Sequence, residues 1–202
     1  MTRRFALSFD YLCPFARNAH EHVITALRDG ADWDVTFVPY SLSQGHVPEG
    51  EPALWERDDP AAASGILAFL VALTVRDDDP DRFLDVHEAL FATRHDHGRD
   101  IKDPAVLAEA LDELGLDGAD VVTGAQDGRA LKTLQQEHEA AVADHDVWGV
   151  PTFIGADRAV FVRLLDRPDG DAALARRRVE QVLDLVEGEP ALHEFKQTEL
   201  SR

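Results

Sequence analysis

The stretch that decides the fold runs from residue 5 to residue 16 and reads Phe-Ala-Leu-Ser-Phe-Asp-Tyr-Leu-Cys-Pro-Phe-Ala. Its first five residues form a short apolar run, which predicts a buried strand. Cys13 follows after a brief connection, and Pro14 stands directly behind it. Proline is favoured at the first position of a helix, because its missing N–H would be unpaired there and its φ angle is already set. The sequence therefore predicts a strand, a short connection and a helix that begins after Cys13.

Cys13 is the only cysteine of the 202-residue chain. A thiol at the start of a helix faces unpaired backbone N–H groups and the positive end of the helix dipole. Both stabilise the thiolate, which is the reactive form of cysteine. We therefore expect the pKa of Cys13 to lie well below the value of about 8.5 for a free thiol. The alternative is a buried structural cysteine, which is common for this residue type.

The composition narrows the class of protein. The net charge is −19 and 45% of the residues are hydrophobic, so we expect a globular protein that binds neither nucleic acid nor an anionic membrane. No apolar run is long enough to cross a bilayer, and no signal-peptide stretch follows Arg3 and Arg4. A lone cysteine excludes an internal disulfide and agrees with a reducing compartment. We expect a cytoplasmic protein without a metal site. The sequence leaves open whether the protein forms a homodimer.

The rest of the chain divides into three parts. Residues 14–29 predict a helix that Gly30 ends, and residues 33–40 predict a second strand, which together with the first gives a βαβ unit. Residues 41–59 predict a loop, and residues 60–146 an all-helical block. In that block the helices are expected at 61–75, from Pro80 to about Gly98, from Asp103-Pro104 to Gly115, at 118–124 and at 126–145. A strand hairpin entered through 147–154 and closed at 159–162 then precedes a last helix at 172–187, while Leu192 and Phe195 are expected to dock on the body.

This order of elements resembles the thioredoxin-like fold, and within it the DsbA-like group. Two motifs carry the resemblance, namely Cys13-Pro14-Phe15-Ala16 at the first helix and Val150-Pro151-Thr152 before the third strand. The resemblance implies an α/β fold, with residues 1–59 and 147–202 forming the thioredoxin-like domain and residues 60–146 forming a helical insertion. In that family the proline of the second motif is cis, and its loop faces the active-site cysteine.

The chain departs from the dithiol members of the family at one position. Those members carry Cys-x-x-Cys, whereas Ala16 occupies the fourth position here. A second thiol resolves a mixed disulfide within one chain. Without it, Cys13 can form a mixed disulfide but cannot resolve it within the chain, so an external thiol must release it. The sequence therefore argues against a self-contained dithiol oxidase or disulfide isomerase.

Three functions remain open. The first is a thiol-dependent oxidoreductase in which an external thiol such as glutathione or mycothiol resolves the mixed disulfide. The second is a transferase or isomerase that activates the thiol of such a cosubstrate, as the resemblance to kappa-class glutathione transferases and hydroxychromene-carboxylate isomerases implies. The third is a non-catalytic, chaperone-like relative that binds peptides. None of them requires a tightly bound cofactor.

The candidate site residues follow from the two motifs. Cys13 is the expected catalytic residue, and the expected substrate-binding residues are Tyr11, Pro14, Phe15, Trp148, Val150 and Pro151. The aromatic members of this set are expected to form an apolar wall. The resemblance implies that Val150 pairs with the main chain of glutathione and that Asp166 or Asp171 holds its amino group. Arg17 and Asn18 are expected to face solvent, and Asp10 to tune Cys13 or to cap the helix.

Overall fold

The fold was analysed in a computed structural model that describes residues 2–192. Its strands are β1 (Arg3–Phe9), β2 (Trp33–Pro39), β3 (Thr152–Ile154) and β4 (Ala159–Phe161). Its helices are α1 (Pro14–Arg28), α2 (Leu42–Gly45), α3 (Ile66–Asp78), α4 (Phe83–His95), α5 (Pro104–Asp112), α6 (Gly118–Gly124), α7 (Arg129–His145) and α8 (Ala172–Gly188). None of these helices is long and apolar enough to cross a membrane. Phe195 lies outside the described residues, and Leu192 is 40% exposed.

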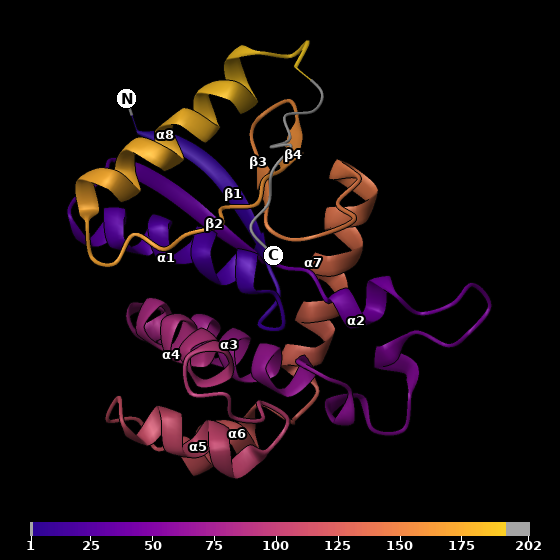
Figure 1. Ribbon diagram of the computed structural model, residues 1–202. Coiled ribbons are helices and arrows are strands. Elements are labelled where there is room, and N and C mark those ends of the chain that lie inside the picture. Colours follow the sequence, from indigo (N-terminus) through magenta and orange to yellow (C-terminus); the bar gives the residue numbers. More distant parts are fainter. Residues whose placement is uncertain (1, 193–202) are drawn as a thin grey trace.

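The four strands form one mixed sheet in the order β2-β1-β3-β4 (Figure 1). β1 and β2 are parallel, as predicted from the βαβ pattern, and Phe5 is in register with Val35. β3 runs antiparallel to both β1 and β4, which confirms the predicted hairpin. This topology puts β1 in the interior of the sheet, and its residues Leu7 and Phe9 are fully buried.

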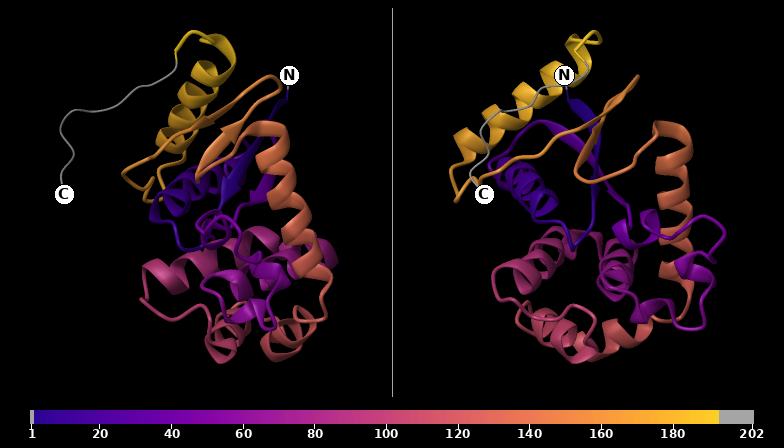
Figure 2. Two further views of the ribbon diagram at one scale, coloured as in Figure 1. Left: turned by 90° about the vertical axis from the view of Figure 1, so that its right-hand side faces the viewer. Right: turned by 45° about the vertical axis from the view of Figure 1, so that its right-hand side comes forward.

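Helices cover the sheet on both sides and extend beyond one end of it. α1 and α8 pack together on one side, and α7 runs beside β2 on the other (Figure 2). The helices α3 to α6 gather below the sheet, where the loop from β1 to α1 points toward them (Figure 1). We propose that residues 60–146 form an insertion in a thioredoxin-like domain, because α3 to α7 separate β2 from β3 along the chain. The start of α1 thus lies at the junction of the sheet and these helices.

The start of α3 differs from the prediction. The composition predicted a helix from residue 61, but α3 begins at Ile66, and Pro60–Ala62 form a separate 3₁₀ turn. Gly65 adopts a φ of +81°, which interrupts the chain between the two pieces. A Cβ atom at Gly65 would lie 3.2 Å from Cγ of Leu12 and 3.4 Å from Oδ1 of Asp10. The positive φ favours glycine here, and the chain passes close to the loop that carries Cys13.

A chain of buried hydrogen bonds ties the sheet and α1 to α4. Nε2 of His20 lies 3.2 Å from the Ser8 carbonyl, so it must donate, and the same ring accepts through Nδ1 from Nε2 of His87 at 2.9 Å. Nδ1 of His87 then accepts from the Tyr11 hydroxyl at 2.7 Å. Burial lowers the pKa of His20 to about 3, so this ring is neutral at neutral pH. The tautomers of both rings follow from this one direction of donation.

Candidate active site

Cys13 is the N-cap of α1, as predicted. Its Sγ lies 3.4 Å from the backbone nitrogen of Ala16, which donates to it, and Pro14 is the first residue of the helix. The thiol itself is 3.4 Å from the Val150 carbonyl oxygen, to which it can donate. The side chain is buried, with 8% of the residue exposed. The two motifs that were read from the sequence therefore meet at one sulfur atom.

The expected low pKa of Cys13 is not supported. Burial raises the pKa of the thiol above its ordinary value of 9.0, because the charged form loses its hydration. The backbone N–H groups of Ala16 and Phe15 lower the pKa, as the helix start predicts, and so does the charge of Arg163. These effects do not offset burial, and the negative charge of Asp10 adds to it. In the resting protein Cys13 is a protonated thiol at neutral pH.

This state predicts how reactivity depends on pH. Below the thiol pKa the thiolate fraction grows about tenfold per pH unit, so the rate constant of Cys13 with a small neutral disulfide should rise steadily from about pH 6 to about pH 8. Stopped-flow absorbance measurements with dithiodipyridine test this, with a free cysteine peptide as the reference. A rate that levels off below about pH 7 would show that the thiol ionises easily and would contradict the assignment.

The second motif forms the opposite wall of the site. The peptide bond between Val150 and Pro151 is cis, and both residues are buried. The backbone nitrogen of Thr152 donates to Oγ of Ser8 at 2.9 Å, which fixes this segment to β1. The Pro151 carbonyl accepts from the backbone nitrogen of Val162 at 3.1 Å. The loop before β3 is therefore held between β1 and the segment that follows β4.

The predicted aromatic wall is partly corrected. Tyr11 is fully buried and its hydroxyl is bonded to His87, so its side chain cannot line an accessible site and belongs to the core. Trp148 is 71% exposed, and its ring lies 4.7 Å from that of Phe161. Phe15 is half-buried and Pro14 is exposed at the start of α1. The sequence analysis missed Phe161. This residue precedes Arg163 by two positions, and strand alternation would put the two side chains on one face.

Asp10 holds the loop that carries Cys13. Its buried carboxylate accepts from the backbone nitrogens of Leu12 at 2.8 Å and Leu42 at 2.7 Å. Burial raises its pKa to about 6, and these two hydrogen bonds oppose the rise. The carboxylate therefore joins the active-site loop to the start of α2, and it raises the pKa of Cys13 rather than lowering it.

Replacing Asp10 with alanine should lower the free energy of unfolding by about 2–4 kcal/mol, because two buried N–H groups lose a charged acceptor. Chemical denaturation followed by circular dichroism measures the change. The exposed Asp58 offers a matched control, since Asp58→Ala should alter stability by no more than about 0.5 kcal/mol. Equal effects of the two substitutions would show that the Asp10 contacts do not stabilise the loop.

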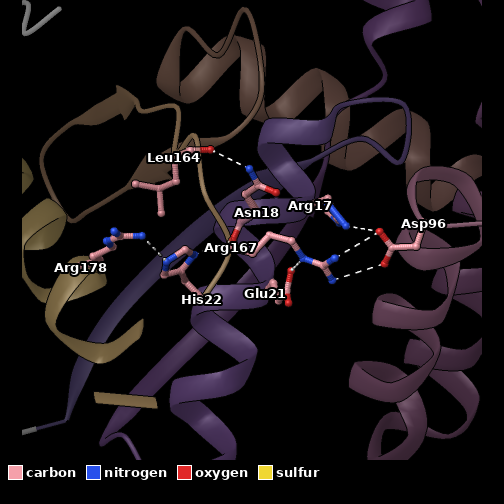
Figure 3. Close-up of polar contacts among 8 residues, drawn as sticks. All are labelled: Arg17, Asn18, Glu21, His22, Asp96, Leu164, Arg167 and Arg178. Atoms are coloured by element: carbon pink, nitrogen blue, oxygen red, sulfur yellow. Dashed lines mark hydrogen bonds and ion pairs between the residues drawn. The ribbon is translucent and has the colours of Figure 1, made fainter. Parts of the chain in front are cut away.

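Arg17 and Asn18 do not face solvent as expected. Figure 3 shows that both point toward segments distant in the sequence. Arg17 pairs with Asp96 at the end of α4, and its side chain is 13% exposed. Nδ2 of Asn18 donates to the Leu164 carbonyl at 3.0 Å. Arg167 extends this network, because it bonds Glu21 at 2.6 Å and also reaches Asp96. The segment after β4 is thus fastened along α1 beside Cys13.

The two carboxylates expected to hold a glutathione amino group are already engaged. Asp171 caps α8 by accepting from the backbone nitrogen of Leu174 at 2.9 Å. Asp166 pairs with Arg178, which also lies 3.2 Å from Nε2 of His22 (Figure 3). Each of these contacts uses one carboxylate oxygen, Oδ1, as the acceptor. The role implied for Asp166 or Asp171 stays a prediction.

A small cavity lies next to the residue that precedes Cys13, but Cys13 itself does not line it. This cavity of about 350 Å³ borders Leu12 and is also lined by Gly65, Arg94 and Lys102. A larger groove of about 700 Å³ lies between β2 and α7, but Cys13 does not line it. Within residues 2–192, no three His, Cys, Asp or Glu side chains are grouped so that they could hold a metal ion.

Comparisons with known proteins place this geometry in a family. A family model described as the DSBA-like thioredoxin domain matches residues 6–170. The chain belongs to this family. Its members are thiol-disulfide oxidoreductases or isomerases, and we class this DSBA-like protein as an enzyme of that kind. The match spans both motifs, so the resemblance that was read from the sequence is confirmed.

Solved structures share the fold of this DSBA-like protein at low sequence identity. The cytosolic disulfide reductase DsbM from Pseudomonas aeruginosa with GSH superimposes with a TM-score of 0.63 at 17% identity, covering 90% of this chain and 100% of the other. A 2-hydroxychromene-2-carboxylate isomerase gives a TM-score of 0.62 at 13% identity, covering 90% and 96%. The catalytic domain of Proteus mirabilis ScsC gives 0.57 at 19%, covering 88% and 83%. No curated protein sequence matches the chain.

Proposed function

We propose that this protein is a cytoplasmic thiol-disulfide oxidoreductase that works with Cys13 alone. The observation that carries the proposal is the contact of Sγ with both the helix start and the Val150 carbonyl, in a chain that has no second cysteine. The external partner is a low-molecular-weight thiol, either glutathione or mycothiol. The similarity to the reductase DsbM, whose structure was solved with GSH, supports a thiol of this class.

The proposed reaction consists of two thiol–disulfide exchange steps. Cys13 loses its proton, and the thiolate attacks one sulfur of the substrate disulfide. A bond forms between Sγ and that sulfur, while the substrate S–S bond breaks and the other half leaves as a thiolate that takes up a proton. The external thiol then attacks the mixed disulfide, binds the substrate sulfur and releases Cys13. The enzyme ends as it began, and the substrate disulfide has exchanged one partner.

The residues of this chain have defined tasks in these steps. The N–H groups of Phe15 and Ala16 stabilise the Cys13 thiolate, and Arg163 does so through its charge. The Val150 carbonyl accepts from the resting thiol and is free once the proton has left. Ala16 occupies the position at which a resolving thiol would stand, so the mixed disulfide persists until a second thiol arrives.

The proposal is tested by turnover with a mixed disulfide between a small thiol and a peptide. Release of more than one equivalent of peptide thiol per protein should require glutathione or mycothiol, and the thiol that sustains the faster turnover is the natural partner. At low concentrations of the external thiol, the rate of turnover should increase with that concentration. Failure of both thiols to sustain turnover, with a folded protein, would refute the oxidoreductase function.

A transferase or isomerase is the second candidate, and the raised pKa of Cys13 favours it. A thiol that stays protonated can donate a hydrogen bond, as Cys13 does toward the Val150 carbonyl. In such an enzyme the donor would stabilise the thiolate of bound glutathione or mycothiol rather than attack a disulfide. The shared fold with a 2-hydroxychromene-2-carboxylate isomerase is consistent with this alternative.

A further inference from the structure

Arg163 lies close enough to Cys13 for its charge to act on the thiol, and its guanidinium lies over two aromatic rings. Its Cζ is 5.3 Å from the centre of the Phe15 ring and 6.0 Å from that of Phe161. Trp148 extends this surface, because its exposed ring lies 4.7 Å from Phe161. These four residues come from α1, the loop before Val150, β4 and the segment after β4. We call them the aromatic–arginine surface.

The backbone on both sides of Arg163 is fixed. The preceding residue, Val162, donates its N–H to the Pro151 carbonyl, and the following residue, Leu164, accepts from Asn18 of α1. Arg167 anchors the same segment to Glu21 (Figure 3). The backbone of Arg163 is therefore placed next to the cis-proline loop before any substrate arrives, so this segment needs no ordering on binding.

The guanidinium of Arg163 is not paired with any carboxylate of the described residues. Its side chain is exposed, and in residues 2–192 it has neither a hydrogen bond nor an ion pair. By contrast, Arg17 and Arg167 on the neighbouring elements are paired with carboxylates. Arg163 therefore presents a free positive charge on a chain whose net charge is −19. Contact with the two rings holds the guanidinium near Phe15 and Phe161, while its N–H donors have no partner among the described residues.

We propose that Arg163, held by the aromatic–arginine surface, recognises a carboxylate that the substrate carries close to its reactive sulfur. This proposal rests on the function proposed for Cys13 and adds the substrate class, which is an anionic disulfide whose sulfur is attached to a flat or apolar group. The rings of Phe161 and Trp148 contact that apolar part, and Arg163 binds the carboxylate. Without Arg163 the acidic protein would repel such a substrate.

The test compares two aromatic disulfides that differ in charge. Dithiobis(nitrobenzoate) carries carboxylates next to its rings, and dithiodipyridine is neutral. The rate constant of Cys13 is measured with each by stopped-flow absorbance. The ratio of the two rate constants removes any common effect of Arg163 on the Cys13 thiolate, because that effect slows both reactions alike. Arg163→Gln should lower this ratio about tenfold, and Arg163→Lys should lower it less.

Arg177→Gln is the matched control, because Arg177 is an exposed arginine on α8 without a hydrogen bond or ion pair in the part of the chain that the structure describes. This control should leave the ratio unchanged. A ratio unaffected by Arg163→Gln, with Cys13 still reacting with both probes, would overturn the proposal for Arg163 alone. Failure of both probes to react with Cys13 in the unmodified protein would instead overturn the function proposed for Cys13.

Discussion

Replacing Cys13 with serine should abolish disulfide exchange, with a fall of at least about 1,000-fold in the rate of peptide thiol release. Serine cannot form a mixed disulfide, and no other cysteine exists to take its place. The fold should survive, since serine is a preferred N-cap and can accept from the backbone nitrogen of Ala16 as the sulfur does. Turnover assays on a variant with an unchanged circular dichroism spectrum measure the effect.

The same substitution separates the two candidate functions when Cys13→Ala is added. A serine hydroxyl still donates a hydrogen bond, whereas alanine does not. Disulfide exchange should be lost in both variants. If turnover persisted in Cys13→Ser and disappeared only in Cys13→Ala, Cys13 would act as a hydrogen-bond donor, and the transferase or isomerase function would replace the oxidoreductase.

Introducing a second thiol at position 16 should change how the release of substrate depends on the external thiol. Residues three apart on a helix are neighbours, with Cβ atoms about 5–6 Å apart, so a thiol in Ala16→Cys can reach Cys13. It should attack the mixed disulfide, release the substrate thiol and leave a disulfide between residues 13 and 16. In a single turnover the half of the substrate held on Cys13 should then leave as a thiol without external thiol, whereas in the unmodified protein this half leaves only when an external thiol attacks the mixed disulfide.

Ala19→Cys is the control for this experiment. Ala16 and Ala19 are both fully buried on α1, so the two substitutions add the same group to similar surroundings. Residue 19 is two helical turns from the start, about 9 Å along the axis, which is too far to bridge to Cys13. The control should keep its dependence on external thiol. Release of the half held on Cys13 without external thiol in the unmodified protein would contradict the role assigned to Ala16.

The fold was largely predictable because its signals are local. Alternating and apolar runs marked the strands, and proline and glycine marked helix ends such as Pro14 and Gly30. The predicted beginning of α3 was wrong, because the alanine-rich segment before Ile66 is compatible with a helix by propensity. The positive φ of Gly65 breaks it there, and that φ is needed where the chain passes the loop of Cys13, which is a tertiary contact.

The site was only partly predictable, because burial and distant partners decide its chemistry. The helix start at Cys13 was visible, but the burial that raises the thiol pKa comes from the whole fold. Arg17 and Asn18 read as surface residues, yet their partners are 79 and 146 residues away in the sequence. The bond between Tyr11 and His87 spans 76 residues. Hydrophobic periodicity in the sequence does not indicate which distant side chains form such hydrogen-bonded pairs.

The most direct test of the single-cysteine mechanism is the intact mass of the protein after incubation with oxidised glutathione or its mycothiol counterpart. We expect the mass to increase by one thiol group on Cys13, the adduct to remain stable after the oxidant is removed, and the original mass to return only when the free thiol is added. An unchanged mass with both oxidants, or an adduct that disappears without added thiol, would contradict the mechanism.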